Sequence, residues 1–456
     1  MPRLSIAREI SYDTLVGVIS ERKDPDELLE QYYEKAGSKL KRIDKNLAKE
    51  IVYGTLRWWS KMYWILQHTS SRDLNKSSPE VQVALCAGTY QIYYLDRIPD
   101  RAAVNESAEY MRKRKQTSAV SFVNGILRQI AKKANYFPKP DKVEKPVEYL
   151  SLQFAHPHWM VERWYERFKF DRLSEMLKNS NEAPPITIRM NSLKTSFEDQ
   201  ADFMSKLLKE ESIHSVKRPL RGAIRLKQSP DLSKGSLFDQ GYYTIQDESS
   251  QLIAHLVSPS EGDIIVDTCS GPGGKLTHMY ELAGGKAEIY SIEKDQSQYE
   301  KAVSNGQRLG YDNIHFVHED FLNYKPEKTP NKILIDAPCT GMGVLRRHPD
   351  GKMHKTPDIV EIMAKKQKDI LAHAFSILSP GGEIVFSVCS FETEETTDQL
   401  KWLESQFGDK IEVIPPGERI QDFYIKYVTK ENVLLVYAGN TDLMDGFGAF
   451  VIRKKA

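Results

Sequence analysis

Three of the four cysteines follow or end short apolar segments of the kind that form buried strands. Cys269 follows DIIVDT, Cys339 follows KILIDAP, and Cys389 lies near the end of EIVFSVCS. A thiolate in such a place can act as a nucleophile toward a bound substrate. Zinc is the first rival, but no paired Cys or His at metal-binding spacing accompanies them, so we expect no metal. A buried structural role suits Cys86, in an apolar helical segment, better than it suits Cys339 and Cys389.

The loop after the first of these segments is rich in glycine and other small residues. It reads Asp267-Thr-Cys-Ser-Gly-Pro-Gly-Gly-Lys275 and leads into a helical pattern. Glycine lets the backbone approach a ligand closely, and N–H groups at a helix start point toward that ligand. The spacing excludes a Walker phosphate loop, which would end in Gly-Lys-Ser or Gly-Lys-Thr. It also excludes the Gly-x-Gly-x-x-Gly dinucleotide motif.

Acidic residues end the next two strand-like segments. Glu293 stands roughly 20 residues beyond the glycine loop, where a carboxylate can hydrogen-bond ribose hydroxyls. Glu319 and Asp320 end the third segment. Taken alone, Glu293 is a surface charge, but with the loop in register a ligand role is favoured. Loop and acids together indicate an adenosine-containing cofactor without a pyrophosphate, for which S-adenosylmethionine is the obvious candidate.

These side chains need a sheet that brings several strand ends together. From Gln246 onward, apolar strands alternate with helical segments, which indicates a mainly parallel sheet covered on both faces. In such sheets, ligands bind outside the carboxyl ends of the strands. The strands of this α/β domain are expected at 263–268, 287–292, 313–318, 332–337 and 383–390.

The chain before this domain has a different hydrophobic pattern. Apolar residues three and four apart predict helices through the first 135 residues or so. The stretch 133–150, rich in proline and charge, indicates a linker and a domain boundary. A small α+β module follows the next helices, and it includes an expected helix at 197–211. We therefore divide the chain into 1–140, 141–180, 181–245 and 246–456.

The net charge of +1 conceals an asymmetry between the two ends of the chain. Residues 1–150 carry 26 basic and 19 acidic side chains, whereas the remainder carries 38 and 44. This favours contact of the first part with a polyanion, although a solvated helical surface explains it about equally well. The run MRKRK at 111–115 fits either interpretation. Seven basic residues of the small module could follow a phosphate backbone, yet such a number is ordinary for any surface: Arg189, Lys194, Lys217, Arg218, Arg221, Arg225 and Lys227.

Composition limits the class of protein. The chain has 456 residues, 40% hydrophobic and 10% aromatic, which excludes low-complexity disorder. No run approaches the ~18 apolar residues of a membrane span, and charges interrupt the N-terminal apolar stretch, unlike a secretory signal. Four cysteines do not make a disulfide framework. We expect a soluble, cytoplasmic protein without membrane association or an obligate protein partner.

Several motifs together resemble the Sun (Fmu) family of RNA cytosine-5 methyltransferases. The paired signatures are Pro-Gly-Gly-Lys at 272–275, Asp-Ala-Pro-Cys at 336–339 and Cys-Ser at 389–390. Further matches are Arg189-x-Asn191, Gln246-Asp-x-Ser-Ser250, Arg346-Arg-His-Pro-Asp350 and Asp445-Gly-Phe447. GTYQIYYLDRIPDRAAVNES and FVNGILRQI resemble the NusB-type helical RNA-binding domain. The resemblance covers essentially the whole chain and is weakest at about 200–240. It implies an all-α NusB-like domain, a small α+β RNA-binding module and a Rossmann-like methyltransferase domain.

The resemblance also implies a role for each matching residue. Cys389 would be the nucleophile that adds to cytosine C6, and Cys339 the cysteine that helps to release the product. Asp336 would hydrogen-bond the cytosine N3 edge. The implied S-adenosylmethionine contacts are Cys269, Ser270, Gly271, Pro272, Gly273, Gly274, Lys275, Glu293, Asp320 and Asp336. The implied substrate is RNA, in particular the 16S ribosomal RNA of the small subunit.

The chain departs from the family pattern at a few positions. Ser270-Gly271 stand where Ala-Ala is usual, Val388 replaces a Thr, and Thr396 replaces an Asn. These departures leave open a second function, that of an rRNA-binding assembly factor whose methyltransferase domain no longer turns over. Methylation of an exocyclic amine ranks last. Enzymes of that kind tend to carry Asn- or Asp-Pro-Pro-aromatic where this chain has Asp-Ala-Pro-Cys.

Overall fold

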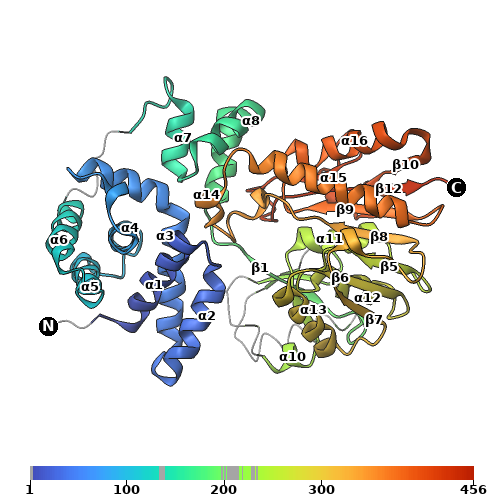
Figure 1. Cartoon of the computed structure of the whole chain (residues 1–456), viewed down its shortest axis with the longest axis horizontal. Helices are drawn as coiled ribbons and strands as arrows, with labels where there is room; N and C mark the ends of the chain where they lie inside the picture. Colours follow the sequence, from blue (N-terminus) through green and yellow to red (C-terminus); the bar gives the residue numbers. More distant parts are fainter. Residues whose placement is uncertain are drawn as a thin grey trace. The chain divides into compact units, whose positions relative to one another are not determined.

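The computed structural model describes residues 4–132, 139–196, 199, 202, 215–217, 219–226, 232 and 235–456. The chain divides into two compact units, which we describe separately (Figure 1). The first comprises Met1–Asn181 and Leu345–Pro357, and the second comprises Glu182–Val344 and Asp358–Ala456. The chain therefore leaves the second unit after Val344, adds a short segment to the first, and returns.

The first unit is helical throughout the part of it that the structure describes, as the periodicity predicts. Its helices are α1 (Ile6–Glu21), α2 (Pro25–Ala36), α3 (Arg42–Thr69), α4 (Pro79–Tyr94), α5 (Asp100–Lys113), α6 (Thr117–Lys132), α7 (Pro146–Phe154), α8 (His158–Asn179) and α14 (Gly351–His354). Asp24 starts α2 by accepting the N–H groups of Asp26 and Glu27. Pro99 caps the start of α5, so the chain breaks between α4 and α5.

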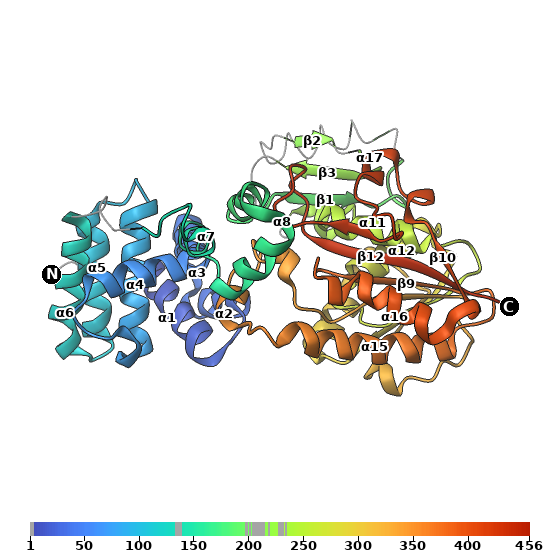
Figure 2. The same cartoon turned by 90° about the horizontal axis from the view of Figure 1, so that it is seen from above.

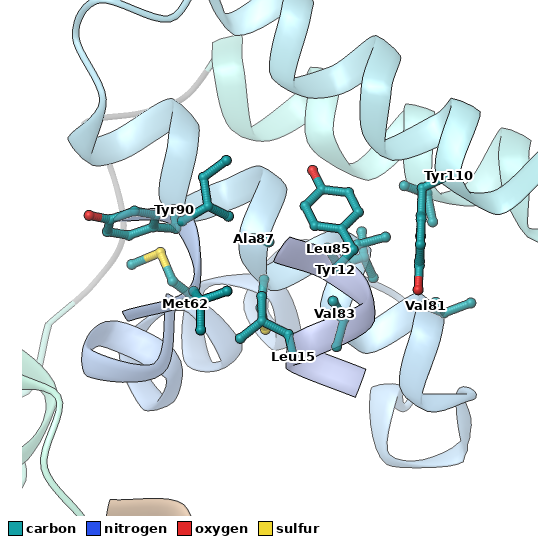
Figure 3. Close-up of a cluster of buried hydrophobic side chains, with 14 of the residues drawn as sticks. Tyr12, Leu15, Met62, Val81, Val83, Leu85, Ala87, Tyr90 and Tyr110 are labelled. Carbon is teal, nitrogen blue, oxygen red and sulfur yellow. The ribbon is translucent and has the colours of Figure 1, made fainter. Parts of the chain in front are cut away.

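Apolar side chains from α1, α3, α4 and α5 form the core of this unit (Figure 3). Tyr12, Met62 and Leu85 are fully buried there. The ring of Tyr12 meets that of Tyr110 edge to face, with centroids 5.0 Å apart. The Tyr12 hydroxyl lies 2.9 Å from the Ser107 hydroxyl, so this aromatic side chain is buried without an unpaired polar end.

Helix α3 is long, with 28 residues, but charged side chains interrupt its apolar sequence. Its apolar face packs against α1 and α4 in the core. Among the residues that the structure describes, no helix combines the length and the apolar character needed to cross a membrane.

The second unit begins with a small antiparallel sheet. Its strands are β1 (Ile186–Met190), β2 (Ser215–Lys217), β3 (Ala223–Leu226) and β4 (Tyr243–Ile245), in the order β2-β3-β1-β4. Figure 2 shows β2, β3 and β1 side by side. The short helix α10 (Ser236–Asp239) precedes β4. Ile188, Ile224 and Tyr243 belong to the apolar cluster of this small sheet. The helix expected at 197–211 lies almost wholly outside the described residues.

Two of the seven basic residues that could follow a phosphate backbone are buried. Arg189 is 1% exposed, and its guanidinium donates to both carboxylate oxygens of Glu281, at 3.0 and 2.7 Å. It also donates to the Gly274 carbonyl at 2.7 Å. Arg225 pairs with the buried Glu248 at 3.0 Å. Neither a phosphate contact nor an ordinary surface position describes Arg189 and Arg225, because these cations join the small sheet to the helices of the larger domain.

The large sheet of the second unit has the order β10-β12-β9-β8-β5-β6-β7, with β11 paired to β12, among the described residues. Its strands are β5 (Ile264–Asp267), β6 (Glu288–Glu293), β7 (Ile314–His318), β8 (Lys332–Asp336), β9 (Glu383–Val388), β10 (Ile411–Ile414), β11 (Leu434–Val436) and β12 (Phe447–Lys454). The five expected strands, β5 to β9, pair in parallel. The antiparallel strands β10 to β12 extend the sheet beyond β9.

Helices cover both faces of this sheet, as alternating strands and helices predict. They are α11 (Glu248–Val257), α12 (Gly274–Leu282), α13 (Gln296–Leu309), α15 (Ile359–Ile377), α16 (Thr397–Phe407) and the short α17 (Asp422–Ile425). Residues of α11, α12 and α13 belong to one apolar cluster, and residues of α15 and α16 belong to another. The Rossmann-like class is therefore confirmed.

Removal of the Arg189 guanidinium tests the connection between the small sheet and α12. Arg189→Ala leaves the buried Glu281 carboxylate without its cation, so we expect the free energy of unfolding to fall by about 3–5 kcal/mol. Lys286→Ala, which breaks an exposed pair with Glu261, is the control and should cost at most about 1 kcal/mol. Urea unfolding followed by circular dichroism measures both. Equal, small losses would contradict a structural role for Arg189.

Candidate active site

The expected site residues meet at one edge of the large sheet. From β5 the chain runs outward through β6 and β7, then returns to place β8 and β9 on the other side of β5. The ends of β5 and β8 therefore flank the point where the strand order reverses, which is where such sheets bind ligands. The glycine loop follows β5, Lys275 lies in the first turn of α12, Glu293 ends β6, and Asp320 follows β7. Asp336 ends β8, and Cys339 and Cys389 lie in the loops after β8 and β9.

The glycine loop is tied to the end of β6. Gly271 and Gly273 have φ values of 52° and 85°, a left-handed conformation that favours glycine. One oxygen of the Glu293 carboxylate accepts the Gly271 N–H at 2.9 Å, and the other accepts the Asp295 N–H at 2.9 Å. Each oxygen keeps a free lone pair, so Glu293 can still accept hydrogen bonds from ribose hydroxyls. The Ser270 hydroxyl lies 2.7 Å from that of Ser291, which adds a second tie.

Asp320 lies farther out along the same edge. It caps a short 3-10 turn, η4 (Phe321–Asn323), by accepting the Leu322 N–H at 3.1 Å. Its side chain is 42% exposed and lies 3.6 Å from the Lys294 ammonium. The carboxylate is therefore accessible to a ligand that enters beside the glycine loop.

A short ion pair lies between the glycine loop and β8. Lys275 Nζ is 2.6 Å from Asp336 Oδ2, and the Ser387 hydroxyl donates to Asp336 Oδ1 at 2.9 Å. Burial disfavours the charged ammonium, but the adjacent Asp336 more than offsets it, so the pKa of Lys275 is raised. Lys275 Nζ also lies 5.2 Å from the centre of the Phe447 ring. The Asp336 side chain remains 28% exposed, so it can face a substrate.

The two expected catalytic thiols lie in contact. Cys339 Sγ and Cys389 Sγ are 3.0 Å apart, although 50 positions separate them in the sequence. Both side chains are partly exposed, and all four cysteines of the chain are free. The hydrogen bond to Cys389, together with burial, raises the pKa of Cys339 well above its usual range. Cys339 therefore holds its proton and is disfavoured as a thiolate nucleophile.

The remaining loop cysteine, Cys269, differs from this pair. Burial raises the pKa of Cys269 to about 12, and its Sγ lies 3.8 Å from the Thr268 hydroxyl. A thiol that keeps its proton is a weak nucleophile. Cys269 is therefore a poorer candidate for a reacting group than Cys389.

Asp267 was not among the expected site residues, yet it lies at the centre of the site. It ends β5, is fully buried, and neither carboxyl oxygen has a hydrogen-bond partner among the described residues. Burial first, and then the charge of Asp336, raises the pKa of Asp267 to about 8. Its place as an acidic residue at the end of the first strand was visible in the sequence, but its isolation from solvent was not.

The raised pKa of Asp267 predicts a pH-dependent stability. The folded state keeps this proton up to about pH 8, whereas an unfolded chain releases it near pH 4. Between these values the folded state binds more protons, so stability falls as the pH rises. Asp267→Asn cannot ionise. As the pH increases, the unfolding free energy of Asp267→Asn minus that of wild type should therefore rise, by up to about 1.4 kcal/mol for each pH unit. Urea titrations at pH 5, 6 and 7 measure this difference, and a constant value would contradict the assignment.

Comparison with known proteins identifies the family. The family models that match are described as "NusB family" over residues 5–132, "Methyltr_RsmF/B-like, ferredoxin-like domain" over 156–233, and "16S rRNA methyltransferase RsmB/F" over 254–447. A protein of Bacillus subtilis (strain 168), named "Probable ribosomal RNA small subunit methyltransferase B", is 30% identical over 455 residues. The match covers 98% of each chain. The chain belongs to the RsmB/F family of 16S rRNA methyltransferases. It is therefore an RNA methyltransferase, and the predicted NusB-like domain and α+β module are confirmed.

A further curated relative and two solved structures are also similar to this chain. "Ribosomal RNA small subunit methyltransferase B" of Salmonella dublin is 29% identical and covers 88% of this chain and 90% of its own. Among solved structures, PH0851 covers 99% of this chain and 100% of its own, with a TM-score of 0.83 at 20% identity. NSun6 from Pyrococcus horikoshii covers 65% of this chain and 97% of its own, with a TM-score of 0.57 at 22% identity. At these identities the two structures show a shared fold.

Proposed function

We propose that this RNA methyltransferase transfers a methyl group from S-adenosylmethionine to C5 of a cytosine in small-subunit ribosomal RNA, with Cys389 as the nucleophile. The observation that carries the proposal is the contact between the Cys339 and Cys389 thiols, 3.0 Å apart. Asp336, at the end of the adjoining strand, lies beside them. Two thiols and a carboxylate at one sheet edge suit addition to a pyrimidine ring.

The chemistry explains why a thiol is needed. Cytosine C5 is a poor nucleophile because the ring is aromatic. Addition of the Cys389 thiolate to C6 breaks that aromaticity and makes C5 enamine-like. Asp336 can hydrogen-bond the N3 edge and stabilise the charge that develops there, provided that it shares a proton with Lys275. The target base must leave its stack to reach this position.

The residues of the glycine loop suit the proposed cofactor. S-adenosylmethionine supplies an electrophilic methyl group on a sulfonium. The left-handed Gly271 and Gly273 allow close backbone approach, and Glu293 and Asp320 can receive ribose and base hydrogen bonds. The structure of NSun6 from Pyrococcus horikoshii was determined with SFG, an analogue of S-adenosylmethionine. That ligand and the orphaned carboxyl of Asp267 support a cofactor here.

After methyl transfer, a base must remove the C5 proton before Cys389 can leave. We assign Cys339 to this late stage. Its sulfur lies within reach of any ring atom bonded to Cys389, because the two sulfurs are in contact. To act as this base, the Cys339 thiol must first release its own proton to solvent, because the Cys389 sulfur stays bonded to C6 until the C5 proton has been removed.

The first unit is proposed to contribute to RNA binding, but not mainly through the MRKRK run. Three of its cations form ion pairs within the unit: Arg112 with Glu109, Lys113 with Glu9, and Arg114 with Asp13. These pairs neutralise the run in part, so its structural role is favoured. Other cations would then supply the phosphate contacts.

The alternative of an assembly factor without turnover receives no specific support. Val388 is fully buried within the apolar cluster that includes residues of α15 and α16. Thr396 donates its hydroxyl to the Glu392 carbonyl at 2.7 Å. Both departures from the family pattern are accommodated by packing and hydrogen bonding that leave the two thiols in contact.

Substitution of the nucleophile tests the proposal directly. Cys389→Ala removes the sulfur that must bond to C6, so methyl transfer to rRNA should fall at least about 10³-fold. Transfer of a labelled methyl group to RNA measures the loss. Cys86→Ala, within the core of the first unit, is the matched control and should retain activity. Equal activity of Cys389→Ala and wild type would reject the nucleophile assignment.

The second cysteine makes a different prediction. If Cys339 acts only at product release, Cys339→Ala should form the bond between Cys389 and C6 but fail to resolve it. We expect a protein–RNA adduct that survives denaturing electrophoresis and depends on S-adenosylmethionine. The double variant Cys339→Ala, Cys389→Ala should form none. Absence of an adduct with Cys339→Ala would contradict the two-cysteine cycle.

A further inference from the structure

Glu395 lies close to Cys339 and precedes Thr396 in the segment that follows Cys389. It ends a short 3-10 turn, η6 (Thr393–Glu395), and its side chain is fully buried. Its Oε1 accepts the Thr340 backbone N–H at 2.8 Å and the Gln367 amide at 3.0 Å. Its Oε2 accepts the Thr340 hydroxyl at 2.5 Å. Breaking these bonds would leave buried donors unpaired, which is costly.

These contacts hold the residues on both sides of Cys339. Thr340 follows Cys339 directly. The Gln367 amide that reaches Glu395 also donates to the Pro338 carbonyl at 3.0 Å, on the other side of the cysteine. The backbone of the Cys339 loop is therefore fixed before and after the thiol.

The same network reaches the second cysteine loop. Thr340 Oγ1 lies 3.2 Å from the hydroxyl of Ser390, the residue after Cys389. Thr340 gives its proton to Glu395, and the Ser390 side chain also hydrogen-bonds the Glu395 carboxylate. A chain of hydrogen bonds thus runs from Ser390 through Thr340 to Glu395, and it joins the two loops that carry the thiols.

The loops need such a connection because the sheet does not extend to them. The pairing of β8 with β9 ends at Asp336 and Ser387. Beyond it, the Ala337 N–H donates to the Ser387 carbonyl at 2.9 Å, and the Gly343 N–H donates to the Cys389 carbonyl at 3.1 Å. Between these two backbone contacts, the Glu395 network holds the residues on either side of Cys339.

We propose that Glu395 is a positioning residue, which sets the separation of the Cys339 and Cys389 thiols through Thr340 and Ser390. The consequence for catalysis rests on the proposed function, whereas the consequence for thiol spacing does not. A test must therefore measure the two separately.

A matched pair of substitutions distinguishes the acceptor from the volume of the side chain. Glu395→Leu has a similar size but accepts no hydrogen bond. Glu395→Gln keeps one acceptor oxygen for the Thr340 N–H and the Gln367 amide, and its own amide can donate to Thr340 Oγ1. Dibromobimane, which becomes fluorescent when two nearby thiols displace its bromines, reports the spacing. Peptide mass spectrometry confirms the linkage between Cys339 and Cys389.

We expect the rate of cross-linking to fall at least about tenfold in Glu395→Leu and less than about threefold in Glu395→Gln. The kcat of methyl transfer should fall by about 100-fold in Glu395→Leu, because small misplacements of reacting groups are costly. The KM for S-adenosylmethionine should stay unchanged, since the glycine loop is not altered. Glu404→Gln, on the exposed face of α16, controls for loss of a charge.

The outcomes separate the two claims. Cross-linking by Glu395→Leu within twofold of wild type would overturn the positioning role. Slower cross-linking with undiminished methyl transfer would support positioning but contradict the proposed cysteine chemistry. If Glu395→Leu does not fold, Thr340→Val and Thr340→Ser decide. Thr340→Val should cross-link more slowly than wild type, whereas Thr340→Ser, which keeps the hydroxyl, should cross-link at close to the wild-type rate. Equal rates for these two variants would overturn the proposal.

Discussion

The parallel pairing of β8 with β9 is the constraint on which the site depends. It places Asp336 opposite Ser387, and the hydrogen bond between their side chains closes the two strand ends at 2.9 Å. The loops that carry Cys339 and Cys389 therefore leave the sheet side by side. A slip of one residue in β9 would turn Ser387 to the other face of the sheet and separate the thiols. The contact between two distant cysteines is thus a product of strand register.

Burial controls the charge of this site. Asp267 and Asp336 lie at adjacent strand ends, and Lys275 balances one of them. The pKa of Asp267 is raised to about 8, so the Asp267 carboxyl is largely protonated near neutral pH. The site therefore carries less negative charge than its acidic residues suggest. That matters for a thiolate, which nearby carboxylates would otherwise disfavour.

Much of this arrangement follows from sequence, because apolar strands alternate with helices and their ends carry the reactive residues. Burial of charged side chains does not follow from sequence, and nothing in the sequence predicted that Arg189 and Arg225 are buried. The antiparallel strands β10 to β12 gave no alternating signal strong enough to predict them. Long-range contacts were equally hidden: Glu395 is one of two acidic residues before Thr396, and nothing in the sequence placed it against Thr340.

The covalent intermediate offers the most direct measurement of the central claim. RNA that contains 5-fluorocytidine cannot lose the C5 substituent as a proton, so the bond to the nucleophile persists after methyl transfer. Protease and nuclease digestion followed by mass spectrometry locates the modified residue. We predict a peptide in which Cys389 carries one methylated fluorocytidine nucleotide. Methyl transfer to unmodified RNA without any such adduct on the fluorinated RNA, or an adduct on Cys339 instead, would contradict the account.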